Sequence, residues 1–262
     1  MNQSDKTQVY PQYQELAGRT VVITGGGSGI GAEMVRAFCL QGARVFFLDI
    51  AEQASQQLVA ALAQQPQPPV YLPCNMADLD AVAQAMAQIE QQAGVIHVLI
   101  NNCANDDRHA VADVTPAYWE ERMAVNLRHQ FFCAQAVARG MRADGGGVIL
   151  NLGSISWHLA LPNLSLYMTA KAAIEGMTRG LARDFGPDHI RVNCIIPGAV
   201  RTPRQMALWH TPDEEARILA GQCLPERVEV EDVAAMALFL ASNGARRCSG
   251  RNYYVDAGWF GA

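Results

Sequence analysis

The alternation of two residue patterns constrains the fold of this chain most strongly. Short β-branched runs alternate with longer stretches in which Ala, Leu and Met recur at helical spacing. Connections of this length make neighbouring strands parallel, with right-handed crossovers. We therefore expect an α/β protein with a doubly wound, mainly parallel seven-stranded sheet and helices on both faces. The expected strands are Thr20–Thr24, Arg44–Leu48, Val70–Cys74, Val95–Ile100, Val148–Leu152, Arg191–Ile196 and Asn252–Val255, and the expected helices lie near residues 29–41, 52–64, 78–93, 115–142, 165–186 and 230–242.

No linker or repeat divides the chain, so residues 1–262 are expected to form a single domain. Residues 201–224 lack the strand-helix rhythm of the rest, and we predict that they form a lid or insertion over the substrate. Hydrophobic residues make up 50% of the chain and charged residues only 17%, which excludes a disordered protein.

Charge and hydropathy patterns exclude several classes of partner. The net charge is -5 without a Lys/Arg-rich block, which argues against binding nucleic acid or an anionic membrane. No run approaches the roughly 20 apolar residues that cross a bilayer, and the first residues lack the pattern of a signal peptide. The seven cysteines are scattered and never form a CxxC pair, which indicates neither disulfides nor a metal site. We expect a cytoplasmic protein.

A glycine-rich segment, Thr24-Gly25-Gly26-Gly27-Ser28-Gly29-Ile30-Gly31, joins the first expected strand to the first helix. Glycines allow the backbone to approach a pyrophosphate, which the helix N-terminus then binds through free N–H groups. Asp49 follows 18 residues after Gly31 at the end of the second strand, where a carboxylate accepts hydrogen bonds from ribose hydroxyls. Its charge would repel a 2′-phosphate. The pattern predicts a Rossmann-type domain that prefers NAD, although Arg44 leaves use of NADP open.

Polar residues follow the next two strands at the same expected edge of the sheet. Asn75 is placed to bond an adenine edge. The segment Asn101-Asn102-Cys103-Ala104 either packs against adenosine or ties neighbouring strands together, and for Asn102 a structural turn is as plausible as a cofactor contact.

Four residues form a candidate catalytic set. Tyr167 and Lys171 are one helical turn apart, so the ammonium is expected to lower the pKa of the phenol and make it a general base. Ser154 follows the fifth strand, where it can donate to the reacting oxygen. Asn126, inside the long helix, is placed to hold a water that relays protons from Lys171.

These motifs together resemble the short-chain dehydrogenase/reductase family along nearly the whole chain. The resemblance rests on Thr24-Gly25-x-x-x-Gly29-x-Gly31, Asn101-Asn102-x-Ala104, Asn126, Ser154, Tyr167-x-x-x-Lys171, and Pro197-Gly198 with Thr202. It implies that Tyr167 is the acid/base, that Lys171 lowers its pKa and holds the nicotinamide ribose, that Ser154 positions substrate and that Asn126 supports a proton relay. The predicted NAD-binding residues are Gly25, Ser28, Gly29, Ile30, Gly31, Asp49, Ile50, Asn75, Met76, Asn102, Tyr167, Lys171, Pro197, Gly198, Val200 and Thr202.

The chain departs from the family pattern at two positions. Asn75 stands where aspartate is common, and Asn105 stands where glycine commonly follows the Asn-Asn-x-Ala segment. Asn105 is therefore a candidate substrate ligand. Polar and aromatic residues gather in three stretches near the expected reaction centre, 105–109, 156–158 and 205–210. This composition suits a polyhydroxylated substrate better than an aliphatic one. The predicted substrate residues are Asn105, Ser154, Ser156, His158, Tyr167, Gln205 and Trp209.

Within the family, the segments 105–109, 126–129, 153–159 and 255–259 resemble the bacterial NAD-dependent aldose 1-dehydrogenases, D-xylose 1-dehydrogenases among them. The resemblance implies oxidation of the anomeric C1 hydroxyl of D-xylose or a related free aldose to the aldonolactone, by a homotetramer. Two alternatives stay open: an NADPH-dependent carbonyl or 3-oxoacyl reductase, and a catalytically idle dinucleotide-binding subunit. The apolar closing segment 258–262 either contacts another subunit or folds back on its own core.

Overall fold

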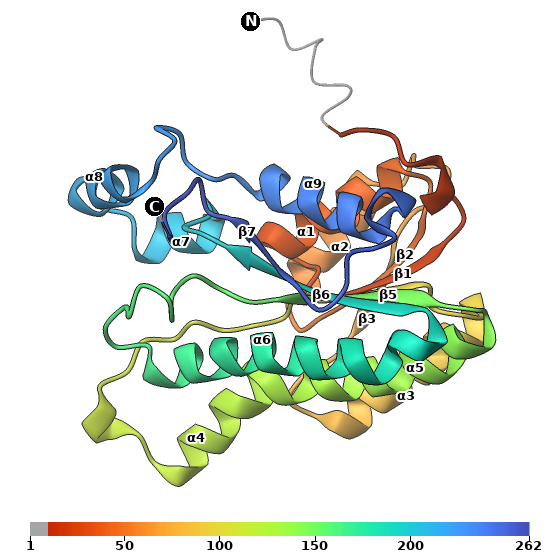
Figure 1. The fold of residues 1–262 in the computed structure, drawn as a ribbon, viewed down its shortest axis with the longest axis horizontal. Helices are drawn as coiled ribbons and strands as arrows, with labels where there is room; N and C mark the ends of the chain where they lie inside the picture. Colours follow the sequence, from red (N-terminus) through yellow and green to blue (C-terminus); the bar gives the residue numbers. More distant parts are fainter. Residues whose placement is uncertain (1–9, 262) are drawn as a thin grey trace, which may run out of the picture.

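The computed structural model describes residues 10–261, and its seven strands form one parallel sheet (Figure 1). The strand order is β3-β2-β1-β4-β5-β6-β7, and all six neighbouring pairs are parallel. The strands are β1 (Thr20–Thr24), β2 (Arg44–Asp49), β3 (Val70–Pro73), β4 (Val98–Asn101), β5 (Gly147–Leu152), β6 (Ile190–Pro197) and β7 (Asn252–Val255). The predicted fold class is confirmed.

Helices cover both faces of this sheet. In Figure 1, α1, α2 and α9 lie above it and α3, α5 and α6 below it. The helices are α1 (Gly29–Leu40), α2 (Glu52–Ala61), α3 (Leu79–Ala93), α4 (Pro116–Met123), α5 (His129–Ala143), α6 (Ser165–Phe185), α7 (Pro203–Leu208), α8 (Pro212–Gly221) and α9 (Val230–Ala241). No helix in residues 10–261 has the length and apolar character needed to cross a membrane.

The alternation of side chains along β1 explains why its sequence is continuously apolar. Val21 and Ile23 pack into the core between the sheet and helices α1 and α9, whereas Val22 packs into the core between the sheet and helices α3 and α5. A strand that is buried on both faces needs apolar residues at every position.

The expected helix over residues 115–142 is interrupted. The chain forms α4, then a π-helical turn over Ala124–Arg128, then α5. A π turn accommodates one extra residue within a helix and is frequent at functional sites. The fourth strand also begins three residues later than expected, at Val98.

The segment 201–224, which lacks the strand-helix rhythm of the rest, contains two short helices, α7 and α8, that were not among the expected helices. Thr202 and Thr211 accept hydrogen bonds from the backbone of Gln205 and Glu214, and each threonine precedes a proline in the first turn. A threonine cap followed by proline is a helix start signal that the sequence contains twice. The N-terminal residues 1–9, which entered the signal-peptide argument, and Ala262 of the closing segment lie outside the described residues.

Candidate active site

A cavity of about 600 Å³ lies at the carboxyl ends of the strands, around the point where β1 and β4 lead to opposite faces of the sheet. Open α/β sheets bind their ligands at such a point. Every predicted site residue except Asn126 and His158 lines this cavity. Those that line it are Gly25, Ser28, Gly29, Ile30, Gly31, Asp49, Ile50, Asn75, Met76, Asn102, Asn105, Ser154, Ser156, Tyr167, Lys171, Pro197, Gly198, Val200, Thr202, Gln205 and Trp209.

The glycine-rich turn leaves no room for a side chain at Gly25 or Gly31. Gly25 has a φ of +66°, and a Cβ on Gly31 would lie 1.9 Å from the Gly25 carbonyl oxygen. Ser28, the residue before α1, makes no capping hydrogen bond with its side chain, so the first N–H groups of the helix remain available. These backbone donors fit a pyrophosphate.

Asp49 is rigidly held beside this turn. Its two carboxylate oxygens accept hydrogen bonds from the backbone N–H groups of Gly27 and Ala51, each at 2.8 Å. Arg44, which left use of NADP open, lies at the opposite end of β2 and does not line the cavity. The negative charge of Asp49 suits an unphosphorylated ribose. This region therefore fits an adenine dinucleotide.

The asparagines that follow the strands have mainly structural bonds. The Nδ2 atom of Asn102 donates to the carbonyls of Thr24 and Gly25 at 3.1 and 2.9 Å, which ties β4 to β1. Asn101 donates to Asn151 Oδ1 on β5 at 2.9 Å. Asn75 accepts from the backbone of Ala77 in a local turn. The tie between neighbouring strands that was expected for the Asn101–Asn102 segment is therefore observed, and Asn75 and Asn102 also line the cavity.

Tyr167 and Lys171 project from the first turns of α6 into the cavity. The Nζ atom of Lys171 lies 5.4 Å from the centre of the Tyr167 ring and donates to the carbonyl of Leu152 at 2.7 Å. Lys171 is 2% exposed. Burial lowers the pKa of Lys171 to about 8.

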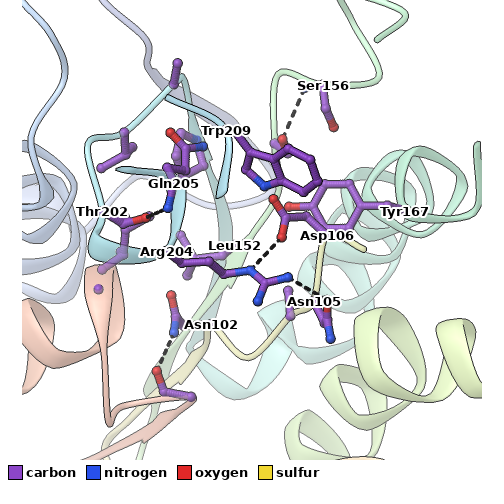
Figure 2. A pocket seen from close by; sticks show the side chains of 18 of the residues that line it. Asn102, Asn105, Asp106, Leu152, Ser156, Tyr167, Thr202, Arg204, Gln205 and Trp209 are labelled. Atoms are coloured by element: carbon purple, nitrogen blue, oxygen red, sulfur yellow. Dashed lines mark hydrogen bonds and ion pairs between the residues drawn. The ribbon is translucent and has the colours of Figure 1, made fainter. Parts of the chain in front are cut away.

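The pKa of Tyr167 differs from the sequence expectation. Burial raises the pKa of this phenol, the negative charge of Asp106 raises it further, and a hydrogen bond with Ser154 opposes the increase. Lys171 was expected to lower this pKa, but in this structure burial raises it. Asp106 lines the cavity beside Tyr167 (Figure 2), so one acidic side chain faces the proposed base.

Asn126 lies in the π turn and is fully buried behind the cavity. Its Oδ1 accepts from the backbone N–H of Asn105 at 2.8 Å, and its Nδ2 donates to the carbonyl of Arg122 at 3.0 Å. It therefore connects the helix to the loop after β4. Ser154 follows β5, and its Oγ accepts from the backbone of Ser156 at 3.1 Å.

His158 lies outside the cavity, contrary to its prediction as a substrate residue. Its Nε2 donates to the buried carboxylate of Glu175 at 2.9 Å, and its ring packs against Phe260 with centroids 4.2 Å apart. Trp157 donates to the same carboxylate at 2.7 Å. A buried carboxylate needs such donors, so these side chains stabilise the core.

On the substrate side of the cavity, two hydrogen-bonding atoms have no partner in the described part of the chain. They are the Nε1 atom of Trp209 and the Oγ atom of Ser156. Both residues line the cavity, together with Gln205 and Asn105. Buried polar atoms of this kind are satisfied when a ligand or water pairs with them. They suit a ligand with several hydroxyl groups.

Sequence reasoning missed two charged residues of this region. Arg204 of α7 donates from Nε to Asp106 Oδ1 at 3.0 Å and from a terminal nitrogen to Asn105 Oδ1 at 3.3 Å (Figure 2). The same guanidinium pairs with Asp107 at 2.9 Å. No local pattern links these acidic residues to an arginine about 100 residues away in the sequence.

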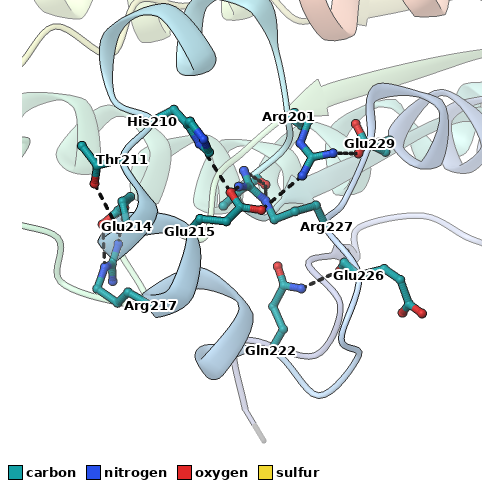
Figure 3. Close-up of polar contacts among 11 residues, drawn as sticks. Arg201, His210, Thr211, Glu214, Glu215, Arg217, Gln222, Glu226, Arg227 and Glu229 are labelled. Carbon is teal, nitrogen blue, oxygen red and sulfur yellow. Dashed lines mark hydrogen bonds and ion pairs between the residues drawn. The ribbon is translucent and has the colours of Figure 1, made fainter.

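Ion pairs anchor the segment 201–224 to the body of the protein (Figure 3). Arg227, whose side chain is 4% exposed, donates to the carbonyl of Ala199 at 2.9 Å and pairs with Glu215 of α8. Arg201 joins Glu215 to Glu229 at 3.1 and 3.0 Å. Ala199 belongs to the loop after β6 that lines the cavity, so α8 is connected to this loop through one buried guanidinium.

The two aromatic residues of the closing segment pack on their own chain to different extents. Trp259 folds back and lines the cavity, with the guanidinium of Arg217 5.4 Å from its ring. Phe260 packs on His158 and Tyr254 but stays 41% exposed.

Comparison with known proteins identifies the class. A family model described as enoyl-(acyl carrier protein) reductase matches residues 25–260. The chain is 57% identical over 247 residues to the D-xylose 1-dehydrogenase of Caulobacter vibrioides, covering 94% of this chain and 98% of that protein. It is 44% identical over 250 residues to a Rhizobium meliloti protein named probable galactose dehydrogenase, covering 95% and 98%. The chain belongs to the short-chain dehydrogenase/reductase family, as its motifs indicated, and is an oxidoreductase.

Solved structures of dinucleotide-binding proteins have the same fold as this chain. A 7α-hydroxysteroid dehydrogenase complexed with NADH and 7-oxo glycochenodeoxycholic acid has a TM-score of 0.88 and 30% identity, covering 93% of this chain and 94% of that one. A blue fluorescent protein from a metagenomic library, in complex with NADPH, has a TM-score of 0.87 and 33% identity, covering 94% and 99%. Relatives thus bind nicotinamide dinucleotides of both kinds.

Proposed function

We propose that this protein oxidises the anomeric C1 hydroxyl of a free aldose, D-xylose or a related pentose or hexose, to the aldonolactone with NAD. One observation carries the proposal: Ser154, Tyr167 and Lys171 share one cavity in a chain 57% identical to a D-xylose 1-dehydrogenase over 94% of its length. The unpartnered Trp209 and Ser156 atoms support a polyhydroxylated ligand.

The choice of NAD rests on the charge at the end of β2. Asp49, held by two backbone N–H groups, would accept hydrogen bonds from ribose hydroxyls and repel a 2′-phosphate. The same charge argues against an NADPH-dependent carbonyl or 3-oxoacyl reductase. The residues of the glycine turn and Asp49 would hold the dinucleotide, which would supply the acceptor for the C1 hydride.

The chain supplies the proton chemistry. Ser154 donates a hydrogen bond to the C1 oxygen, and Tyr167 removes the hydroxyl proton as its general base. Because burial raises the pKa of Tyr167, this role requires the ammonium of Lys171, 5.4 Å from the ring centre, to stabilise the phenolate during the reaction. Loss of this proton and of the C1 hydride together convert the cyclic aldose to the lactone.

Proton release is assigned to the residues behind Tyr167. Lys171 Nζ and the Leu152 carbonyl are hydrogen-bonded, and Asn126 lies buried on the far side of the loop after β4. We assign Asn126 the role of holding a water that passes protons between Lys171 and solvent, and of fixing the backbone at Asn105.

The test is a screen of D-xylose, L-arabinose, D-galactose, L-fucose and L-rhamnose with NAD and with NADP, followed by the absorbance of the reduced nicotinamide. Turnover of at least one sugar, faster with NAD, is expected. Activity on none of them would overturn the sugar assignment. Inactivity across a wider panel of alcohols and carbonyls would instead favour a non-catalytic dinucleotide-binding subunit.

We further propose a homotetramer in the cytoplasm. Trp119, Phe131 and Phe132 are each about 40% exposed on α4 and α5, and such side chains favour burial against another subunit. The seven cysteines are free thiols, which suits a reducing compartment. Light scattering measures the mass of the protein in solution, and a monomeric mass would contradict the tetramer.

The segment 201–224 is proposed to act as the lid over the sugar.

A further inference from the structure

Asp106 has the chemistry of a substrate ligand that the sequence did not identify. Its carboxylate lines the same cavity as Tyr167 and Ser154, and its side chain is 31% exposed. It lies beside the ring of Tyr167 in Figure 2, and its charge raises the pKa of that phenol. A carboxylate only accepts hydrogen bonds, so its ligand must be a donor.

The neighbouring arginine fixes which atom of Asp106 is available. Arg204 donates to Oδ1 at 3.0 Å, and no hydrogen bond engages Oδ2 within residues 10–261. Arg204 also contacts Asn105 and Asp107, so its own position does not depend on Asp106 alone. Figure 2 shows the carboxylate between this arginine and the ring of Tyr167. One acceptor atom is therefore left without a partner among the described residues, on a side chain that lines the cavity.

We propose that Asp106, oriented by Arg204, accepts a hydrogen bond from a ring hydroxyl of the aldose near the carbon that is oxidised, and thereby selects sugars that carry this hydroxyl. This inference rests on the proposed function and adds a specificity-determining residue to it. A site built to bond a hydroxyl discriminates strongly against an analogue that lacks it, because the polar group is left unpaired.

The experiment combines a variant with deoxy sugars. The kcat/KM of wild type and of Asp106→Ala is measured on the best aldose of the screen and on its analogues that lack one ring hydroxyl each. We expect one deoxy analogue to lower the kcat/KM of wild type about 10- to 100-fold. Asp106→Ala should lose a similar factor on the parent aldose and little more on that same analogue.

Asp107→Ala is the matched control. Asp107 is adjacent, pairs with the same Arg204 at 2.9 Å and with Arg122 at 3.0 Å, but does not line the cavity. Asp107→Ala should lower kcat/KM by the same factor on the parent aldose and on every deoxy analogue, because Asp107 contacts none of the hydroxyls. Binding of NAD to each variant shows that the fold is retained.

Three results would count against the assignment. If Asp106→Ala lowers kcat/KM by the same factor on the parent aldose and on every deoxy analogue, Asp106 contacts no hydroxyl. This inference then fails while the aldose function stands. If Asp107→Ala gives the same non-additive pattern, the effect belongs to the loop and the inference also fails. If wild type oxidises no aldose, the proposed function fails first and removes the basis of the inference.

Discussion

The two halves of the cavity are held together in different ways. On the cofactor side, the glycine turn, Asp49 and Asn102 are fixed by backbone hydrogen bonds at the ends of adjacent strands. On the substrate side, the loop after β4 and the segment 201–224 are joined by the ion pairs of Arg204 with Asp106 and Asp107, residues that are far apart in the sequence.

This difference separates dinucleotide binding, which the cofactor side provides, from the choice of sugar, which the substrate side determines. Backbone bonds at strand ends follow from the sheet itself, so the cofactor side is rigid wherever the fold forms. Side-chain pairs such as Asp106 with Arg204 can be exchanged without disturbing the sheet. The contrast indicates that changes on the substrate side redirect the choice of sugar while dinucleotide binding remains.

Replacement of Tyr167 by Phe removes the group that lies where the two halves meet. We expect kcat to fall by about 1,000-fold, because general-base catalysis is lost, while the affinity for NAD is nearly unchanged. Steady-state rates together with a titration of NAD by tryptophan fluorescence measure both quantities. Undiminished turnover would contradict the assignment of Tyr167, and a large loss of NAD affinity would mean that the two halves are not separable.

The contrast between the halves also explains which features could be predicted from the sequence alone. The sheet was predictable because strands buried on both faces have continuous apolar runs, and the intervening helices have their own period. The cofactor residues were predictable because the glycine turn requires glycine: a Cβ on Gly31 would collide with the Gly25 carbonyl. In each case the signal lies within a few residues of the feature.

Other features depend on contacts across the fold. The π turn around Asn126 is stabilised partly by its bond to Asn105, 21 residues away. The Arg204–Asp106 pair forms only once the helix α7 has folded against the loop after β4. His158 was assigned to the substrate because no local pattern shows that Glu175 will be buried beside it. The raised pKa of Tyr167 follows from burial, which one helical spacing does not reveal.

Replacement of Asp49 by Ala tests the cofactor side alone. We expect the preference for NAD over NADP, expressed as the ratio of kcat/KM values, to fall about 10- to 100-fold, because charge-assisted hydrogen bonds to ribose and the repulsion of phosphate are both lost. The KM for the aldose should stay the same. Arg44→Ala is the control on the same strand, and an equal effect there would mean that the cofactor choice is not made at Asp49.

Replacement of Arg227 by Ala tests the substrate side. Its buried guanidinium joins Glu215 to the carbonyl of Ala199, and its removal leaves this carbonyl without its donor and Glu215 with only the more exposed Arg201 and His210. We expect kcat/KM for the aldose to fall about 10-fold, with less change in NAD affinity. Arg201→Ala is the control, because Arg201 is 42% exposed and such surface pairs contribute little. Equal losses for the two variants would contradict a special role for the buried contact.

Replacement of Asp106 by Asn tests the electrostatic link between the two halves and should give the smallest effect. The negative charge of Asp106 disfavours the Tyr167 phenolate and so contributes to its raised pKa. Neutralising that charge should lower the pKa of Tyr167, and the limb of the pH profile of kcat on which activity rises with pH should move to lower pH. Asp107→Asn, which removes an adjacent charge outside the cavity, should leave this limb in place. A shift to higher pH in Asp106→Asn would mean that the carboxylate supports the phenolate, for instance by ordering a donor next to it, and that the substrate side does not act on Tyr167 through charge.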